Sequence, residues 1–183
     1  MASKAQLRQR FKNILKEKEN LKLQDDLSLS KNLKSLFQEL KIIGKQKVLG
    51  GYSPMRYEPA WFKELGKGDF RYSLVHMHKN IELSYHQIEF QKLVNGNYKL
   101  CLPENERRAC VNPDLILVPG LAFSDQCERL GRGRAYFDSF MKSYQGIKIG
   151  IFYSYQKCIE LECEEHDEKL DYIVTDKEII RGI

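Results

Sequence analysis

The stretch Asp114–Tyr144, DLILVPGLAFSDQCERLGRGRAYFDSFMKSY, has the pattern on which the predicted fold is built. It begins with a short apolar run of strand length, passes through Pro119-Gly120 into a polar loop, and continues into a segment rich in glycine and arginine. From Tyr136 to Tyr144 the apolar residues then recur at spacings of three and four, which is helical periodicity. We therefore expect a buried strand, a loop and the start of a helix.

The loop Gly131–Tyr136 has the composition of an anion-binding site. Backbone N–H groups of a glycine loop and the N-terminal end of a helix converge where a phosphate can sit. Arg129, Arg132 and Arg134 add guanidinium groups, which bind phosphate oxygens through two N–H groups at once. Asp138 follows one helical turn after Arg134, and a carboxylate beside a phosphate site is a natural Mg²⁺ ligand.

Length and composition restrict the class of protein. A chain of 183 residues with 42% hydrophobic residues is long enough for one folded domain, which we expect over residues 1–183. No apolar stretch is long enough to span a membrane, and the basic N-terminus lacks the apolar core of a signal peptide. The 5 cysteines include no CxxC pair, and His76 and His78 lack a third metal ligand at a suitable spacing. We expect a monomer in a reducing cytoplasm, without membrane association.

Charge is unevenly distributed along the chain. Residues 1–50 hold 12 Lys or Arg against 5 Asp or Glu, whereas residues 156–183 hold 4 against 9. Such runs are either solvated faces or, at the N-terminal end, a basic surface that faces an anionic ligand. The basic residues are not densely interleaved with aromatic residues, as they are on surfaces that bind single-stranded nucleic acid. We therefore expect a small anionic ligand and no nucleic-acid partner.

Strands and helices alternate along the chain. Apolar residues at helical spacing predict helices over residues 3–19, 26–40 and 59–65, and Gly44 is expected to end the second. Short apolar or alternating runs predict strands over residues 47–52, 70–76, 81–88, 98–103, 148–154 and 172–175. The expected fold class is α/β: a single domain with a central mixed, mostly parallel sheet flanked by helices in a three-layer α/β/α arrangement.

Two further segments carry candidate binding residues. The loop SPMRYEPAWF, residues 53–62, follows a predicted strand, and such loops bind ligands in α/β proteins. Its Glu58 is either a surface charge or a group that binds an amine or amide-like edge, and Trp61 either anchors the core or stacks on a ligand. In the first helix, Lys4 and Arg8 share one face, so they form either a solvated basic stripe or a pair of cations that reach a phosphate.

The segment PGLAFSDQCERLGRGRAYFD, residues 119–138, resembles the signature of the 5-formyltetrahydrofolate cyclo-ligase family, also called 5,10-methenyltetrahydrofolate synthetases. In that family a strand ends in a Pro-x-x-x-Phe-Asp loop, and Arg-Leu-Gly-x-Gly-x-Gly-Tyr-Tyr-Asp follows. The residues that match this pattern are Pro119, Phe123, Arg129, Leu130, Gly131, Gly133, Tyr136 and Asp138. Residues 52–58 resemble the family's substrate loop, and the helix that carries Lys4 and Arg8 resembles its basic helix.

The resemblance implies a reaction in which ATP and Mg²⁺ drive the cyclisation of 5-formyltetrahydrofolate to 5,10-methenyltetrahydrofolate, with release of ADP and phosphate. It implies ATP binding by Lys4, Arg8, Arg129, Leu130, Gly131, Arg132, Gly133, Arg134, Ala135, Tyr136 and Phe137, among which Arg132, Arg134 and Tyr136 would act in catalysis. The implied folate-binding residues are Ser53, Glu58, Trp61 and Tyr98, and the implied Mg²⁺ ligands are Asp138 and Asp167.

Four positions depart from the family pattern. Ala135 replaces a glycine, Phe137 a tyrosine, Ser124 an aspartate and Cys127 a loop glycine. If position 135 requires a positive φ angle, the Cβ of alanine costs roughly 1 kcal/mol there. An alternative interpretation of the sequence is therefore a relative that binds nucleotide or folate with impaired catalysis.

Overall fold

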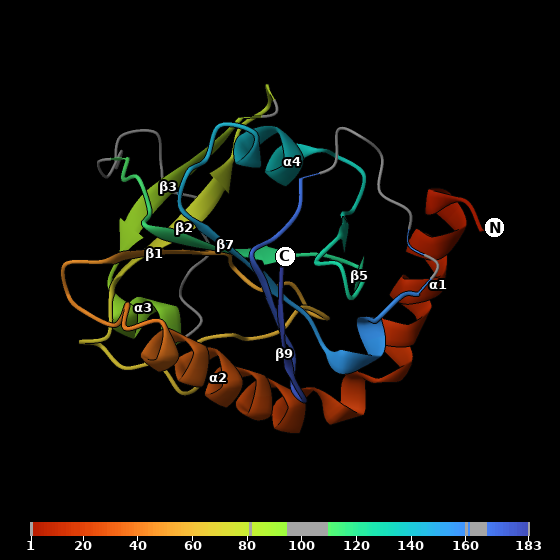
Figure 1. Cartoon of the computed structure of the whole chain (residues 1–183), viewed down its shortest axis with the longest axis horizontal. Helices are drawn as coiled ribbons and strands as arrows, with labels where there is room; N and C mark the ends of the chain where they lie inside the picture. Colours follow the sequence, from red (N-terminus) through yellow and green to blue (C-terminus); the bar gives the residue numbers. More distant parts are fainter. Residues whose placement is uncertain (1, 81, 95–109, 160, 162–167, 183) are drawn as a thin grey trace.

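The computed structural model describes residues 2–80, 82–94, 110–159, 161 and 168–182. These residues form a seven-stranded sheet with the strand order β3-β2-β1-β4-β7-β8-β9 (Figure 1). Its strands are β1 (Val48–Gly51), β2 (Arg71–Met77), β3 (Leu83–Ile88), β4 (Leu115–Pro119), β7 (Ile147–Ile151), β8 (Tyr172–Val174) and β9 (Ile179–Arg181). The strands from β2 to β8 in this order are parallel, and the two edge strands β3 and β9 are antiparallel to their neighbours. The predicted mixed, mostly parallel sheet is confirmed.

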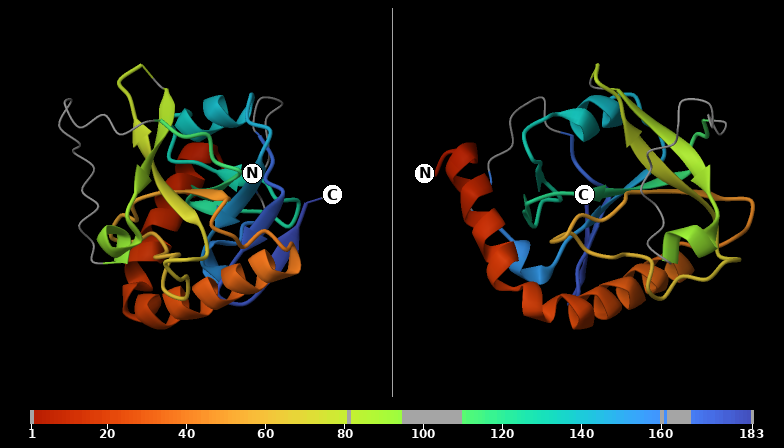
Figure 2. Two further views of the ribbon diagram at one scale, coloured as in Figure 1. Left: turned by 90° about the vertical axis from the view of Figure 1, so that its left-hand side faces the viewer. Right: turned by 180° about the vertical axis from the view of Figure 1, so that it is seen from behind.

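Both faces of the sheet are covered, which explains the apolar run at its centre. Leu115 and Leu117 of β4 pack in the cluster that contains the residues of α1 (Lys4–Glu17) and α2 (Lys22–Glu39), whereas Ile116 and Val118 pack with α4 (Tyr136–Met141). Successive side chains of a strand point to opposite faces, so a strand buried on both faces reads as a continuous apolar run. Figures 1 and 2 show α1 and α2 on one side of the sheet and α4 on the other, which confirms the three layers.

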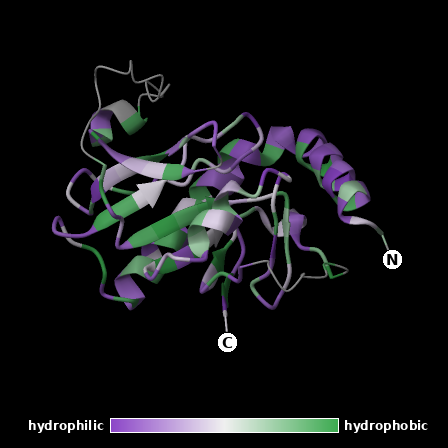
Figure 3. Cartoon of the chain, turned by 90° about the horizontal axis from the view of Figure 1, so that it is seen from above, coloured by the Kyte–Doolittle hydropathy of each residue, from purple (hydrophilic) through white to green (hydrophobic). Residues whose placement is uncertain are grey.

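The helix α1 begins at a reciprocal cap. The Ser3 hydroxyl accepts a hydrogen bond from Gln6 N at 3.3 Å, and Gln6 Oε1 accepts one from Ser3 N at 2.8 Å. Leu7, Phe11 and Leu15 form its buried stripe, while its other faces are hydrophilic (Figure 3). No helix in the described ranges is both long and apolar enough to cross a membrane.

The helix α2 differs from its prediction at both ends. It starts at Lys22, four residues before the predicted residue 26, and it ends at Glu39. Lys41 adopts a left-handed conformation with φ 54°, and Ile42 N donates to Phe37 O at 3.1 Å. This bond belongs to the turn that usually places glycine after a helix. Lys41 therefore ends the helix in the place expected of Gly44.

The predicted helix over residues 59–65 is wrong, because side chains of α2 bind the backbone groups that a helix would need. Ser30 Oγ donates to Trp61 O at 2.8 Å and accepts from Glu64 N at 2.8 Å. Lys34 Nζ donates to Glu64 O at 2.9 Å. The segment consequently forms turns.

The remaining described elements are short. They are η1 (Glu19–Leu21), α3 (Phe90–Val94), β5 (Ala122–Phe123), β6 (Arg129–Leu130) and η2 (Ser154–Gln156). The elements α3, β5, β6 and β9 were not predicted. The strand predicted over residues 98–103 lies outside the described residues.

Two positions at which the family signature has glycine are left-handed in this chain. Cys127 has φ 58° and Ala135 has φ 54°, while Gly133 between them has φ 95°. Left-handed backbone conformations bring Cβ close to the following carbonyl oxygen, at a cost of roughly 1–2 kcal/mol. The chain therefore carries backbone strain beside its signature loop.

Replacing a residue of positive φ, such as Ala135 or Lys41, by glycine is expected to stabilise the protein. Ala135→Gly and Lys41→Gly should each raise the free energy of unfolding by up to about 1 kcal/mol, since glycine adopts positive φ without a Cβ clash. Lys31→Gly, at an exposed interior position of α2, is the control and should lower that free energy by about 1 kcal/mol. Urea unfolding measures all three, and a loss of stability in Ala135→Gly would contradict the assignment of strain.

Candidate functional site

The loops after β1 and β4 meet at the point where the strand order reverses. The chain passes from β1 to its parallel neighbour β2 on one side, and from β4 to its parallel neighbour β7 on the other. Because β1 and β4 are themselves parallel neighbours, the loops that follow them start side by side at the carboxyl edge of the sheet. This is the position at which open α/β sheets usually bind ligands.

An ion pair joins these two loops. Arg132, from the glycine-rich loop, donates from Nε to Glu58 Oε1 at 3.0 Å, and its Nη2 lies 2.9 Å from the same oxygen. Glu58, from the loop after β1, also accepts a hydrogen bond from Met55 N at 2.9 Å through Oε2. The Glu58 side chain is only 4% exposed, whereas that of Arg132 is 36% exposed. A buried carboxylate requires such partners, so this contact brings the predicted phosphate loop and substrate loop together.

The helix α1 packs against the glycine-rich loop. Arg8 Nε donates to Gly131 O at 3.1 Å. Gly133 has φ 95°, a conformation that favours glycine, and the position of its absent Cβ lies 3.5 Å from Arg8 Cζ, so the guanidinium packs against this turn. Lys4 is half-buried one turn before Arg8. The structure thus places the predicted basic helix beside the predicted phosphate loop.

Arg129, a residue of the predicted ATP site, is buried. Its side chain is 4% exposed, with Nη1 donating to Pro119 O at 3.1 Å and Nη2 donating to Asp138 Oδ1 at 2.5 Å. The buried guanidinium therefore holds Asp138 at the start of α4, and phosphate binding by Arg129 stays a prediction. The side chains of Leu130 and Phe137 are buried in the two core clusters, so only their backbone groups are left for the predicted contact with ATP.

Arg134 and Tyr136 flank the strained Ala135. Arg134 is exposed, which is a requirement for a residue that binds an anion from solvent. Tyr136 is half-buried, and its hydroxyl donates to His78 O at 3.0 Å, in the hairpin between β2 and β3. The hydroxyl thereby anchors α4 to that hairpin.

The metal-binding predictions have little support in the described residues. Asp138 is paired with Arg129, and no group of three or more His, Cys, Asp or Glu residues in the described part of the chain is arranged to hold a metal ion. Asp167 lies outside the described residues. On the hairpin, His78 Nε2 and His86 Nε2 each lie 2.8 Å from Ser84 Oγ, so these histidines are occupied by a shared hydroxyl.

Among the predicted folate-binding residues, Trp61 is corrected to a core residue. Its side chain is fully buried, and its Nε1 donates to Tyr52 O at 3.0 Å, so its ring cannot stack on a ligand. Ser53 is half-buried in the loop after β1. Tyr98 lies outside the described residues.

The departure at Ser124 from the family aspartate is explained by the local turn. Ser124 Oγ accepts a hydrogen bond from Gln126 N at 3.2 Å and donates to Glu128 Oε2 at 2.8 Å. A serine hydroxyl closes a turn as an aspartate carboxylate does. The turn leads into Cys127, whose positive φ is described above.

Sequence reasoning missed a polar cluster under the loop after β1, formed by Lys22, Asp26 and Tyr153. Asp26 Oδ1 accepts hydrogen bonds from Ala60 N at 2.8 Å and from the Tyr153 hydroxyl at 2.7 Å. The signal was present in the sequence, because Asp26 falls on the apolar stripe of α2, three residues before the buried Leu29. An aspartate at a core position of a helix indicates a buried polar contact.

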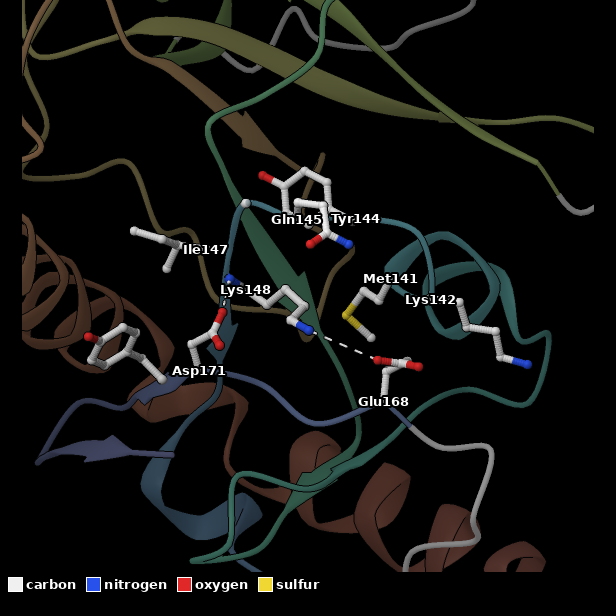
Figure 4. Close-up of a pocket in the computed structure, with 10 residues that line it drawn as sticks. Met141, Lys142, Tyr144, Gln145, Ile147, Lys148, Glu168 and Asp171 are labelled. Atoms are coloured by element: carbon white, nitrogen blue, oxygen red, sulfur yellow. Dashed lines mark hydrogen bonds and ion pairs between the residues drawn. The ribbon is translucent and has the colours of Figure 1, made fainter. Parts of the chain in front are cut away.

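A groove of about 580 Å³ lies at the other end of the strands (Figure 4). It is bordered by the starts of β7 and β8, where Lys148 N donates to Asp171 Oδ2 at 2.7 Å and Lys148 Nζ lies 4.0 Å from Glu168 Oε2. Since these are the amino ends of the strands, the groove lies at the opposite edge of the sheet from the loops after β1 and β4. It does not belong to the candidate site.

Known proteins share both the sequence and the fold. The profile of the 5-formyltetrahydrofolate cyclo-ligase family matches residues 1–176. A probable 5-formyltetrahydrofolate cyclo-ligase of Schizosaccharomyces pombe is 30% identical over 110 residues, which are 51% of this chain and 54% of the relative. A 5-formyltetrahydrofolate cyclo-ligase of Mus musculus is 36% identical over 67 residues, or 33% of each chain. The matched regions thus span about half or less of these curated relatives.

Two solved structures resemble the whole fold. A 5,10-methenyltetrahydrofolate synthetase from Mycoplasma pneumoniae has a TM-score of 0.74 at 22% identity and covers 96% of this chain and 100% of that one. A 5,10-methenyltetrahydrofolate synthetase from Aquifex aeolicus has a TM-score of 0.72 at 28% identity and covers 97% and 92%. The signature loop at the switch point, the match over residues 1–176 and the shared fold show that this chain belongs to the 5-formyltetrahydrofolate cyclo-ligase family.

Proposed function

We propose that this protein is a 5-formyltetrahydrofolate cyclo-ligase that uses ATP and Mg²⁺ to form 5,10-methenyltetrahydrofolate. The observation that carries the proposal is the contact between Arg132, which follows β6, and Glu58, in the loop after β1. It supports a site in which the proposed phosphate loop adjoins a carboxylate suited to an amide-like ring edge. Transfer of the γ-phosphoryl group of ATP to a formyl oxygen requires the nucleotide and the folate to bind next to each other.

The chemistry requires a good leaving group on the formyl carbon. The formyl oxygen forms a bond to the γ-phosphorus of ATP, and the bond from that phosphorus to the ADP oxygen breaks. N10 then attacks the formyl carbon and loses its proton, and inorganic phosphate departs with the former formyl oxygen. No side-chain nucleophile takes part, so the protein supplies mainly positioning and charge neutralisation.

Residues of this chain fit those two tasks. Glu58 uses Nε and Nη2 of Arg132, which leaves Nη1 of the part-exposed guanidinium for a γ-phosphate oxygen. Arg8, beside Gly131, and the exposed Arg134 would neutralise the remaining phosphate charge. Lys4, on the same helix face as Arg8, would extend this basic surface. Glu58 would accept hydrogen bonds from the N–H groups of the pterin edge, with Ser53 beside it.

Magnesium fits this site in part. Asp138 has one carboxylate oxygen on Arg129, and its second oxygen is the atom that would hold the ion, directly or through water. Bound Mg²⁺ would neutralise phosphate oxygens during transfer. Asp167 completes the proposed pair.

A second candidate function is nucleotide or folate binding with little turnover. It is favoured by the positive φ of Ala135, because a methyl group stands where the family has glycine beside the phosphate loop. The burial of Phe137 weakens this alternative, since its ring is part of the core and lies below the site.

Turnover is tested by following the absorbance of the methenyl product with 5-formyltetrahydrofolate, Mg²⁺ and ATP. We expect wild-type turnover, and Arg132→Met should lower kcat/KM by about 100-fold or more, because a charge that stabilises phosphoryl transfer is lost. Arg181→Met is the control, since Arg181 pairs with Glu39 on the exposed surface at 2.8 Å. A folded wild type without turnover would overturn the proposed function, and an unchanged Arg132→Met would overturn the site.

Ala135→Gly separates the two candidates in the same assay. For an active enzyme, turnover should stay within about tenfold of wild type, which corresponds to 1.4 kcal/mol. A much larger gain, absent from Lys41→Gly, would establish the impaired relative.

A further inference from the structure

Lys22 holds the backbone of the residue whose carboxylate faces the site. Its Nζ donates to Glu58 O at 2.5 Å, and the same ammonium group contacts Asp26 Oδ2 at 3.1 Å and the Tyr153 hydroxyl at 3.0 Å. The Lys22 side chain is 25% exposed. A lysine that is mostly buried and fills its donor sites with protein acceptors is held in one place.

Asp26 holds the other side of Pro59. Its Oδ1 accepts from Ala60 N at 2.8 Å and from the Tyr153 hydroxyl at 2.7 Å, and its side chain is 4% exposed. Burial and the charge of Asp26 raise the pKa of Tyr153, so its hydroxyl stays protonated and donates. Lys22 and Asp26 therefore fix the carbonyl before Pro59 and the N–H after it.

Helix stability does not account for this cluster. Lys22 is the first residue of α2, where the helix dipole disfavours a cation, and Leu21 before it provides no side-chain cap. Lysine four residues before an acid is also the less favourable order for an ion pair along a helix. Because the placement of Lys22 and Asp26 is unfavourable for the helix itself, it indicates that the pair has a role outside the helix.

That role concerns the Glu58 carboxylate. Proline restricts the residue before it to extended conformations, and the cluster fixes the peptide groups on both sides of Pro59. Glu58 Oε2 is then set by Met55 N at 2.9 Å, so the carboxylate is held independently of Arg132. A carboxylate fixed in this way meets a ligand without losing conformational freedom on binding.

We propose that Lys22, Asp26 and Tyr153 are positioning residues that preset the Glu58 carboxylate for the amide-like edge of the folate ring. The inference rests on the proposed function and adds the residues that determine folate affinity. It predicts that removing the cluster weakens folate binding and leaves ATP binding almost unchanged, because ATP meets the loop after β4.

The test compares Lys22→Met with Lys34→Met. Lys34, on the same helix, also donates to a loop carbonyl, Glu64 O at 2.9 Å, but that carbonyl lies outside the site. We expect Lys22→Met to raise KM for 5-formyltetrahydrofolate about tenfold or more, with KM for ATP within about twofold of wild type. Lys34→Met should leave both values unchanged, whatever its effect on stability.

Lys22→Met leaves the buried Asp26 charge without its cation, so Lys22→Met with Asp26→Asn is the second variant. It removes both charges and keeps an oxygen for Ala60 N, and its folate KM should rise in the same way. Calorimetric binding of 5-formyltetrahydrofolate without ATP should show the same loss. The inference would be overturned by an unchanged folate KM and affinity in the folded variants, or by equal effects in Lys34→Met. Absence of both turnover and folate binding in the wild type would instead overturn the proposed function itself.

Discussion

The contact between Arg132 and Glu58 is the interaction on which the site depends. Glu58 lies in the loop after the central strand β1, and Arg132 follows β6 in the segment that leaves the neighbouring strand β4, at the point where the strand order reverses. Glu58 is buried and Arg132 is part-exposed, so one partner is fixed and the other reaches solvent. In the proposed function, this asymmetry would let the contact join a carboxylate that binds folate to a cation that binds phosphate.

Each of the two N-terminal helices contributes a cation that supports this contact. Arg8 of α1 binds the carbonyl of Gly131, and Lys22 of α2 binds the carbonyl of Glu58. The basic N-terminal third of the chain is thus explained in part by two cations that bind backbone carbonyls at the site. Its remaining basic residues are mainly exposed.

The sequence predicted the strands and long helices because burial on one or both faces leaves a period in the apolar residues. It failed where side chains distant in the chain decide the local structure. Residues 59–65 were predicted to be helical, but Ser30 and Lys34 bind their backbone groups. In the same way, the sequence does not reveal that the Arg129 guanidinium is held by Pro119 and Asp138.

A double-mutant cycle on the free energy of unfolding, with Glu58→Gln and Arg132→Met singly and together, tests the central claim most directly. Glutamine keeps an oxygen for Met55 N and removes the charge that Arg132 pairs with. For a pair with one buried and one part-exposed member, we predict a coupling free energy of about 1–2 kcal/mol. Additive effects, with coupling close to zero, would contradict the claim that this ion pair joins the two loops.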